Sequence, residues 1–311
     1  MSLPLLLAAL PLLYWPQGVD TAPALKQAGI ARIAVPPEQA AAWRAAGLAV
    51  VEIAGADLAA RTLLPAPGIV PQTRRVSATA SPWVTTNAWR FVRDAQGRWR
   101  YELPAGRAAL AAAEAFAYGA DALLQIDPAD LAELGRMLEF LASLPTGELA
   151  PVADFGLVDD GTPVVGEVIN LLLRRNLLFA PLREPDGRFK LNVRVGDKKY
   201  PLKEAVDPSA FALKLRRELG DERRSLRLYG SEGVIARLTG DADRRRLHLL
   251  NYGGRDLEGL RVRVRGALAE GEGHVSGVGR VTLEERVVEG GFTEFSLPRI
   301  GAYTLVELRS R

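Results

Sequence analysis

The sequence predicts an α/β protein: a contracted or incomplete (β/α)8 barrel of the TIM type, followed by a C-terminal antiparallel β-sandwich. Up to about residue 222, short apolar runs alternate with helix-like segments, which is typical of a parallel sheet with helical crossovers. From residue 223 onward the helical periodicity stops, and short alternating segments follow at close spacing. We therefore expect a barrel-like domain over residues 1–222 and a β-sandwich domain over residues 223–311.

Strand–helix units open the chain. Strands are expected at "LLYW" (12–15), "ARIAV" (31–35) and "LAVVEI" (48–53), because each is a short continuous apolar run of the kind that a buried parallel sheet contains. After the second strand comes "PEQAAAWRAAG" (37–47), with proline at its start and glycine at its end, as is usual for a helix.

The first residues also resemble a leader. Residues 3–13 are apolar enough for the core of a signal peptide, so residues 1–13 are a candidate leader. No Lys or Arg precedes this run, no small-x-small cleavage site follows it, and it is too short for a transmembrane helix. Export and cytoplasmic residence both stay open, and no membrane span is expected.

Residues 65–104 interrupt the alternation, since they are rich in Pro, Thr, Ser and Trp. "RVSATA" (75–80) is predicted to be a strand, and residues 89–103 are predicted to form a hairpin around "DAQG". Between them lies "SPWVTTNAW" (81–89), which holds two of the five tryptophans of the chain.

The alternation then resumes. "AGRAALAAAEAFAYG" (105–119) is predicted to be a helix that ends at Gly119, and residues 128–144 are predicted to be an amphipathic helix with Pro128 in its first turn. The remaining predicted strands are 120–127, 151–160, 177–182 and 191–195, and the remaining predicted helices are 163–176 and 207–219. The strand count is about eight, as in a barrel, although about 250 residues are typical of that fold. An open, doubly wound sheet is the alternative.

The C-terminal segments carry the alternation of an antiparallel sheet. They are residues 224–230, 233–240, 244–254, 260–268, 280–288, 293–298 and 302–309. In "LRVRVRG", Arg261, Arg263 and Arg265 fall on one face of a strand. This arrangement indicates a solvated strand face, or alternatively a site for an acidic ligand.

Composition excludes several chemistries. The chain has no cysteine, which excludes disulfides, thiolate nucleophiles and Cys-ligated zinc. Its two histidines, His248 and His274, both lie in the C-terminal third, so histidine-based catalysis or metal binding is not expected in the larger N-terminal part. The net charge of +3 gives no support to a nucleic-acid partner. Phosphate-binding and serine-hydrolase motifs are missing, and no cofactor or metal is predicted.

Carboxylates are the remaining catalytic candidates. Asp20, Glu52, Asp127 and Asp159 lie at or just beyond predicted strand ends, where parallel α/β proteins gather functional groups, and Asp154 lies in a predicted strand. Glycoside hydrolysis needs only a carboxylate pair. Glu52, Asp127 and Asp154 are therefore the candidate catalytic residues. The structural alternatives are a helix N-cap for Asp127 and a turn for Asp159.

The indole-rich segment suggests a substrate class. Sugars stack their C–H faces on indoles and pair their hydroxyls with amides, so Trp83, Asn87 and Trp89 are candidate carbohydrate contacts. Trp15 and Asp20, near the end of the first strand, are further candidates. The structural alternative is that these tryptophans plug one end of the barrel.

A family resemblance rests on several phrases. They are "AFAYGADALLQID" (115–127), residues 152–182, "RRRLHLLNYGGRDLEGLRVRV" (244–264) and "FSLPRIGAYTLVEL" (295–308). In layout the chain resembles barrel glycoside hydrolases of the family 42 β-galactosidase type, which follow the barrel with an amidotransferase-like segment and a small β domain. The chain departs from them in lacking the Glu that follows an Asn at the fourth strand and a late-strand nucleophilic Glu. These departures suit a degenerate relative.

Two functions follow as hypotheses. One is a carbohydrate-active, glycoside-hydrolase-like protein that uses a carboxylate pair. The other is a non-catalytic carbohydrate-binding or assembly module derived from a glycosidase. Either one implies a carbohydrate partner, and a homo-oligomer is compatible with both.

Overall fold

The computed structural model describes residues 10–70, 83–145, 147, 149–230 and 233–310. Two compact units make up the chain: Met1–Gly68 with Asp94–Glu148, and Ile69–Arg93 with Leu149–Arg311. The predicted domain boundary at residues 222 and 223 stays a prediction. The first nine residues of the candidate leader and the predicted strand "RVSATA" lie outside the described residues.

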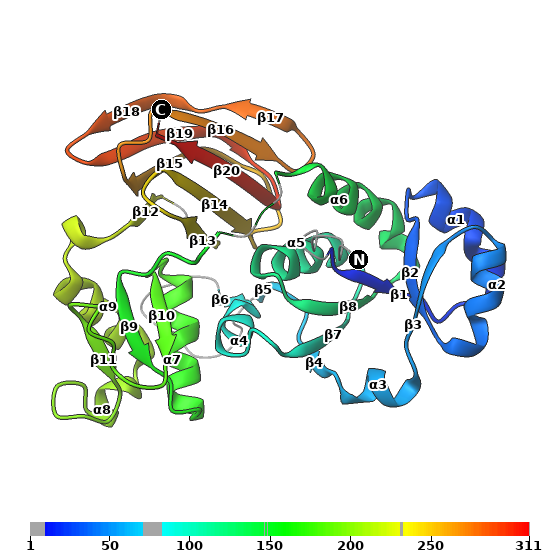
Figure 1. Cartoon of the computed structure of the whole chain (residues 1–311), viewed down its shortest axis with the longest axis horizontal. Coiled ribbons are helices and arrows are strands. Elements are labelled where there is room, and N and C mark those ends of the chain that lie inside the picture. Colours follow the sequence, from blue (N-terminus) through cyan, green and yellow to red (C-terminus); the bar gives the residue numbers. More distant parts are fainter. Residues whose placement is uncertain (1–9, 71–82, 146, 148, 231–232, 311) are drawn as a thin grey trace, which may run out of the picture. The chain divides into compact units, whose positions relative to one another are not determined.

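The first unit is built on a six-stranded sheet in the order β3-β2-β1-β8-β7-β4, and all of its strand pairs are parallel (Figure 1). The strands are β1 (Leu12–Tyr14), β2 (Arg32–Val35), β3 (Ala49–Glu52), β4 (Thr62–Leu64), β7 (Arg98–Glu102) and β8 (Asp121–Gln125). This sheet confirms the predicted α/β class. From β4 to β3 the strands keep the cyclic chain order of a barrel, with β8 beside β1 and with β3 and β4 as edges. A Rossmann-type sheet would instead place β4 beside β1.

Helices join these strands, as the sequence predicts. They are α1 (Ala22–Gln27), α2 (Ala40–Ala45), α3 (Gly55–Ala60), α5 (Ala108–Tyr118) and α6 (Leu131–Ser143). Helix α5 is buried along most of its length, which its alanines permit, and Gly119 ends it in the left-handed conformation at φ 64°. Its one acidic residue, Glu114, is fully buried and accepts a hydrogen bond from the Tyr101 hydroxyl at 2.9 Å.

Two close contacts fix α6 and the start of α5. Asp130, in the 3-10 turn before α6, accepts hydrogen bonds from the backbone N–H groups of Gly106 (2.8 Å), Arg107 (3.2 Å) and Ala108 (3.4 Å). Its carboxylate therefore satisfies the free donors at the N-terminus of α5. Gly135 in α6 lies against the carbonyl oxygen of Ala28, which ends α1, and an added Cβ would stand 1.7 Å from that oxygen.

The second unit contains a three-stranded parallel sheet in the order β10-β9-β11. Its strands are β9 (Phe155–Val158), β10 (Phe179–Leu182) and β11 (Asn192–Arg194), and its helices are α4 (Ala88–Arg93), α7 (Pro163–Arg174), α8 (Leu202–Ala205) and α9 (Pro208–Leu219). β5 (Gly68–Val70) and β6 (Trp83–Thr85) form a two-stranded sheet. Thr162 caps α7 and Asp207 caps α9, each by accepting a backbone N–H.

The predicted hairpin over residues 89–103 is wrong. Residues 88–93 form α4, which buries Ala88 and Phe91 at helical spacing, and residues 98–102 form β7, which pairs parallel with β4 and β8. The sequence alternates large and charged residues here, and that pattern fits a helix with an i, i+3 apolar face as well as a strand. Long-range pairing of β7 decides between the two.

The rest of the second unit consists of two antiparallel sheets, in the orders β12-β15-β19-β18 and β13-β14-β20-β16-β17 (Figure 1). The strands are β12 (Leu226–Tyr229), β13 (Val234–Gly240), β14 (Arg244–Asn251), β15 (Leu257–Arg265), β16 (Glu270–Val275), β17 (Gly279–Thr282), β18 (Glu284–Glu289), β19 (Phe292–Ile300) and β20 (Tyr303–Arg309). Both sheets contribute to one hydrophobic cluster, which includes Val262 and Phe295 from the first and Leu247 and Val306 from the second. Arg261 and Arg263 share an ion pair with Glu294, and each has a second acidic partner, which is Glu285 for Arg261 and Glu222 for Arg263.

Strand β16 was not among the predicted segments. Its sequence "EGEGHV" has glycine at two positions, and glycine is unusual in strand interiors. Gly271 and Gly273 face the hydrophobic cluster, where Leu308, Leu283 and Val281 occupy the space that a Cβ would need. The two glutamates between and beside them consequently point to the other face of the sheet.

None of the helices in the described part of the chain is long and apolar enough to cross a membrane.

Candidate functional site

The segment that carries the predicted sugar-binding tryptophans belongs to the second unit. The Thr86 and Tyr252 hydroxyls lie 2.9 Å apart, which ties the segment to the turn after β14. At the end of α4, Arg93 binds Asp159 with two hydrogen bonds of 2.8 and 2.6 Å, and it also donates to the carbonyl of Thr162. Asp159 follows β9 directly, so this carboxylate fastens α4 to the carboxyl end of that strand.

Asn87 and Trp89 have partners within this segment. Asn87 is fully buried, and its side-chain oxygen accepts a hydrogen bond from Arg90 at 3.0 Å. The Arg90 guanidinium lies 4.2 Å from the centre of the half-buried Trp89 ring, and a Cβ at Gly166 of α7 would stand 3.3 Å from that ring. The guanidinium therefore covers one face of this indole. Trp83 begins β6, and its side chain is outside the described part of the structure.

Trp15 and Asp20 lie in the first unit, just after β1. Trp15 is 2% exposed, and its indole N–H donates to the Thr21 hydroxyl at 2.9 Å. Asp20 is exposed in the 3-10 turn Val19–Thr21. The two residues are thus close in the chain but differ in access to solvent.

Two of the three candidate catalytic carboxylates follow strands of the first unit. Glu52 is the last residue of β3, is exposed, and forms an ion pair with Arg44 at 2.6 Å. Asp127 accepts the backbone N–H of Ala129 at 2.9 Å and so caps the 3-10 turn after β8, as its N-cap interpretation predicts. β2 and β1 lie between β3 and β8, which places the two strands about 14 Å apart along the sheet at about 4.8 Å per strand. Carboxyl pairs in glycosidases are about 5–9 Å apart.

Asp154 lies in the second unit, one residue before β9 rather than within a strand. Its carboxylate accepts the backbone N–H of Ser225 at 3.0 and 3.1 Å, which joins the start of β9 to the residue before β12. Burial raises the pKa of Asp154, and the hydrogen bonds from Ser225 oppose that shift only in part. A raised pKa is what a general acid requires, because it must carry a proton when it acts.

The predicted site residues thus divide between the two units. Glu52, Asp127, Trp15 and Asp20 are in the first, and Asp154, Trp83, Asn87 and Trp89 are in the second. Their shared role in one site stays a prediction.

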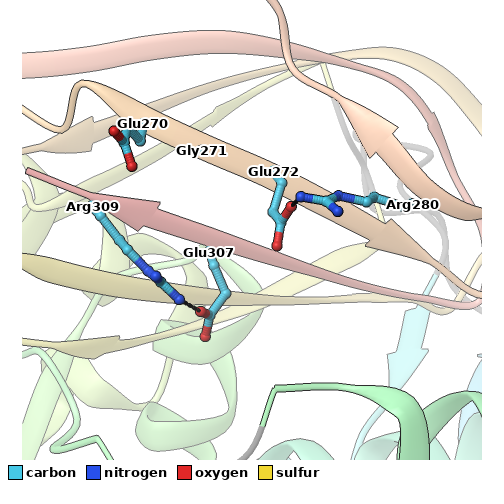
Figure 2. A pocket seen from close by; sticks show the side chains of 6 residues that line it. All are labelled: Glu270, Gly271, Glu272, Arg280, Glu307 and Arg309. Carbon is cyan, nitrogen blue, oxygen red and sulfur yellow. Dashed lines mark hydrogen bonds and ion pairs between the residues drawn. The ribbon is translucent and has the colours of Figure 1, made fainter. Parts of the chain in front are cut away.

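A cavity of about 290 Å³ lies on the outer face of the five-stranded sheet, the face turned away from the hydrophobic cluster. Its lining residues are Glu270, Gly271, Glu272, Arg280, Glu307 and Arg309, which come from β16, β17 and β20. Figure 2 shows the carboxylates and guanidiniums of these strands side by side across the sheet. We name this feature the outer-face cavity.

Glu307 is the buried anchor of the outer-face cavity. It is 3% exposed and accepts hydrogen bonds from Arg244 at 2.9 Å, Arg246 at 2.7 Å and Arg309 at 3.1 Å. Burial alone would raise the pKa of Glu307, but the hydrogen bonds from Arg246, Arg244 and Arg309 outweigh burial and lower it. Glu307 is therefore ionised at neutral pH.

The other two carboxylates of the cavity are nearer to solvent. Glu272 pairs with Arg280 and lies 3.4 Å from the Nε2 atom of His274. Glu270 is exposed, and its carboxylate forms no ion pair or hydrogen bond with another residue of the described ranges. The cavity is therefore lined by two carboxylates that form ion pairs, those of Glu272 and Glu307, and by one unpaired carboxylate, that of Glu270.

Both histidines of the chain belong to the same face of this sheet. His248 of β14 and His274 of β16 stand opposite Leu305 of β20, one on each side. The Nδ1 atom of His248 lies 2.7 Å from the Tyr303 hydroxyl. Burial lowers the pKa of His248 well below 6.5, and the positive charges of Arg237 and Arg246 add to that shift. His248 is therefore neutral at pH 7.

His248 makes the free energy of unfolding depend on pH below neutrality. Its pKa is lower in the folded chain than the unfolded value of 6.5, so its contribution is complete above pH 6.5 and is lost as the pH falls towards the folded value. We expect the free energy of unfolding of wild type to fall between pH 7 and 5 by at most about 1.4 kcal/mol per pH unit more than that of His248→Gln. Urea unfolding at several pH values measures both slopes, and equal slopes would contradict the prediction.

Sequence reasoning missed the outer-face cavity because its residues come from three strands that pair only in the folded sheet. The local signal was present in "EGEGH", where glutamates alternate with glycines and so must share one face of a strand. Among the described residues, no group of three or more histidines and carboxylates is arranged to hold a metal ion.

Comparisons with known proteins give structural matches only. No family model matches the chain, and no curated protein matches it. The α-L-fucosidase isoenzyme 2 from Paenibacillus thiaminolyticus matches with a TM-score of 0.52 at 12% identity, over 88% of this chain and 71% of the fucosidase. The β-galactosidase from Rahnella sp. R3 matches with a TM-score of 0.37 at 9% identity, and a GH42 β-galactosidase from G. stearothermophilus with 0.35 at 10%. The chain covers 60% of each β-galactosidase.

The fucosidase match shows a glycosidase-like fold. The fucosidase match carries that statement, because its TM-score of 0.52 is the highest of the three and it extends over 88% of the chain. At this level of identity the match concerns the fold and does not single out one glycosidase family.

Proposed function

We propose that this protein binds carbohydrate without hydrolysing it, on a scaffold derived from a reduced glycosidase barrel and a C-terminal β-sandwich. One observation carries the proposal: in a glycosidase-like fold, each predicted catalytic carboxylate already forms a hydrogen bond or ion pair with another residue of the chain. Glu52 pairs with Arg44, Asp127 caps a turn, and Asp154 holds the backbone of Ser225. Ion pairs and hydrogen bonds of this kind are expected of carboxylates that stabilise the fold.

The geometry of the first-unit pair supports the absence of hydrolysis. A retaining enzyme needs its two carboxyl groups about 5–5.5 Å apart, and an inverting enzyme needs about 6.5–9.5 Å. Glu52 and Asp127 follow strands that are separated by two others in the sheet. Both side chains are also held by hydrogen bonds within their own strand–helix units.

The choice of carbohydrate as ligand is supported by the matched structure with a TM-score of 0.52, which is an α-L-fucosidase. One fold can host many unrelated functions, so the sugar ligand is inferred by analogy with the matched fucosidase. The polar lining of the outer-face cavity adds a place with donors and acceptors for hydroxyl groups.

A second candidate is an active glycoside hydrolase. The raised pKa of Asp154 favours it, because a general acid must stay protonated until it transfers its proton. Its catalytic pair would be drawn from Glu52, Asp127 and Asp154. Substrate contacts would come from Trp15, Asp20, Trp83, Asn87 and Trp89.

Binding and turnover assays separate the two candidates. We expect wild type to bind glycans on an array and to release no product from aryl α-L-fucosides or aryl β-D-galactosides. Asp154→Asn should leave binding unchanged, since the amide oxygen can still accept the Ser225 N–H. Turnover by wild type that is lost in Asp154→Asn or Glu52→Gln would establish the hydrolase instead, and an array without any bound glycan would contradict the proposal.

A further inference from the structure

We propose that the outer-face cavity binds one neutral sugar unit. This inference rests on the proposed function, carbohydrate binding, and adds the location and the charge of the ligand. The cavity lies within β16, β17 and β20 of the second unit, separate from every residue that the sequence predicted for the site.

The size of the cavity limits the ligand. A volume of about 290 Å³ is just below the range for small-molecule sites, which is about 300–1,000 Å³. A single pyranose ring therefore suits it better than a buried oligosaccharide. A longer glycan would place one end unit in the cavity and leave the rest in solvent.

The lining residues include both acceptors and donors for the hydrogen bonds of a sugar hydroxyl. A sugar hydroxyl donates one hydrogen bond and accepts others. Glu270 and Glu272 accept only, and Arg280 and Arg309 donate only. Glu270 and Arg309 are opposite each other in the β16–β20 pair, so an acceptor and a donor stand side by side, as two neighbouring hydroxyls require.

Two carboxylates that face each other in the same strand pair are a further indication of a ligand. Glu272 and Glu307 are directly opposite in register, and like charges in that position destabilise a sheet. The chain keeps this pair and surrounds it with Arg244, Arg246 and Arg280. Sites where a sequence breaks a local rule and compensates for it nearby are typically functional.

The charges favour a neutral ligand over an anion. Arg280 and Arg309 are already paired with Glu272 and Glu307, so their positive charges are compensated, while their remaining N–H groups can still donate to hydroxyls. Glu270 has no such partner among the described residues and repels an anion at the rim. A neutral hexose meets neither obstacle.

The test is an NMR titration of the full chain with methyl β-D-galactopyranoside, L-fucose and D-galacturonate. We expect a neutral sugar to bind at least about tenfold more tightly than D-galacturonate, which is about 1.4 kcal/mol. Arg280→Ala and Glu270→Gln should each weaken neutral-sugar binding by about tenfold or more. Both residues are exposed, so these variants should fold. Glu289→Ala, an exposed change on β18, is the matched control and should bind as wild type does.

The outcomes distinguish this inference from the proposed function. Neutral-sugar binding that survives both cavity variants would overturn the cavity site and leave carbohydrate binding standing. Equal binding of D-galacturonate and the neutral sugars would overturn the charge preference. A wild type that binds none of the neutral sugars here and no glycan on the array would overturn both proposals.

Discussion

Glu307→Gln is expected to lower the free energy of unfolding by about 3 kcal/mol. The substitution keeps the size of the side chain but removes the negative charge that Arg244, Arg246 and Arg309 share. Removing one partner of a buried ion pair typically costs about 3–5 kcal/mol, because the other charge is left uncompensated. Arg246 is buried, whereas Arg244 and Arg309 are 33% and 56% exposed, so solvent screening places the effect at the lower end.

Urea unfolding at pH 7 measures this loss, and Glu285→Gln is the control. Glu285 also pairs with an arginine, but its side chain is 77% exposed, so its loss should stay within about 0.5 kcal/mol. The pKa of Glu307 is lowered from 4.5, so its stabilising contribution is present above that pH and is lost as the pH falls through the folded value. The difference between wild type and Glu307→Gln should therefore shrink in acid. A loss below about 1 kcal/mol at pH 7 would mean that the arginines do not depend on Glu307.

Gly135→Ala is expected to destabilise the first unit by about 2–3 kcal/mol. An alanine Cβ would stand 1.7 Å from the carbonyl oxygen of Ala28, and that atom belongs to the backbone, so no side-chain rotation relieves the clash. Helix α6 would have to move away from α1, and overpacking of this kind typically costs about 1–3 kcal/mol. The better helix propensity of alanine returns less than about 1 kcal/mol.

Thermal unfolding followed by circular dichroism tests this expectation. Gly55→Ala is the matched control, because Gly55 is also a helical glycine but has open space where its Cβ would be. It should be neutral or slightly stabilising. If Gly135→Ala behaved like Gly55→Ala, the close approach of α1 and α6 would not be needed for stability.

Local patterns predicted much of the fold. The apolar runs at residues 12–15, 31–35 and 48–53 became β1, β2 and β3. Most residues of β1 and β2 are buried, as a continuous apolar run predicts, whereas β3 is an edge strand of exposed and half-buried residues. Gly119 marked the end of α5 because only glycine adopts the left-handed conformation easily. The structure of residues 89–103 was not predictable locally, because β7 is defined by its partners β4 and β8.

The same distinction between local and long-range contacts applies to the candidate site. The capping role of Asp127 was readable, because its partner Ala129 is two residues away. The bond between Arg93 and Asp159 joins residues 66 positions apart, and no pattern in the sequence links them. The outer-face cavity likewise brings residue 270 beside residue 309 through strand register, which a single sequence does not encode visibly.

The division of the chain into units has a consequence for synthesis on the ribosome. The chain passes from the first unit to the second after residue 68, returns at residue 94 and leaves again after residue 148. Thr86 and Arg93 therefore emerge long before their respective partners, Tyr252 and Asp159. During translation the strands of the first unit can therefore pair before these two contacts form, and neither unit can be removed by a single cut without taking part of the other.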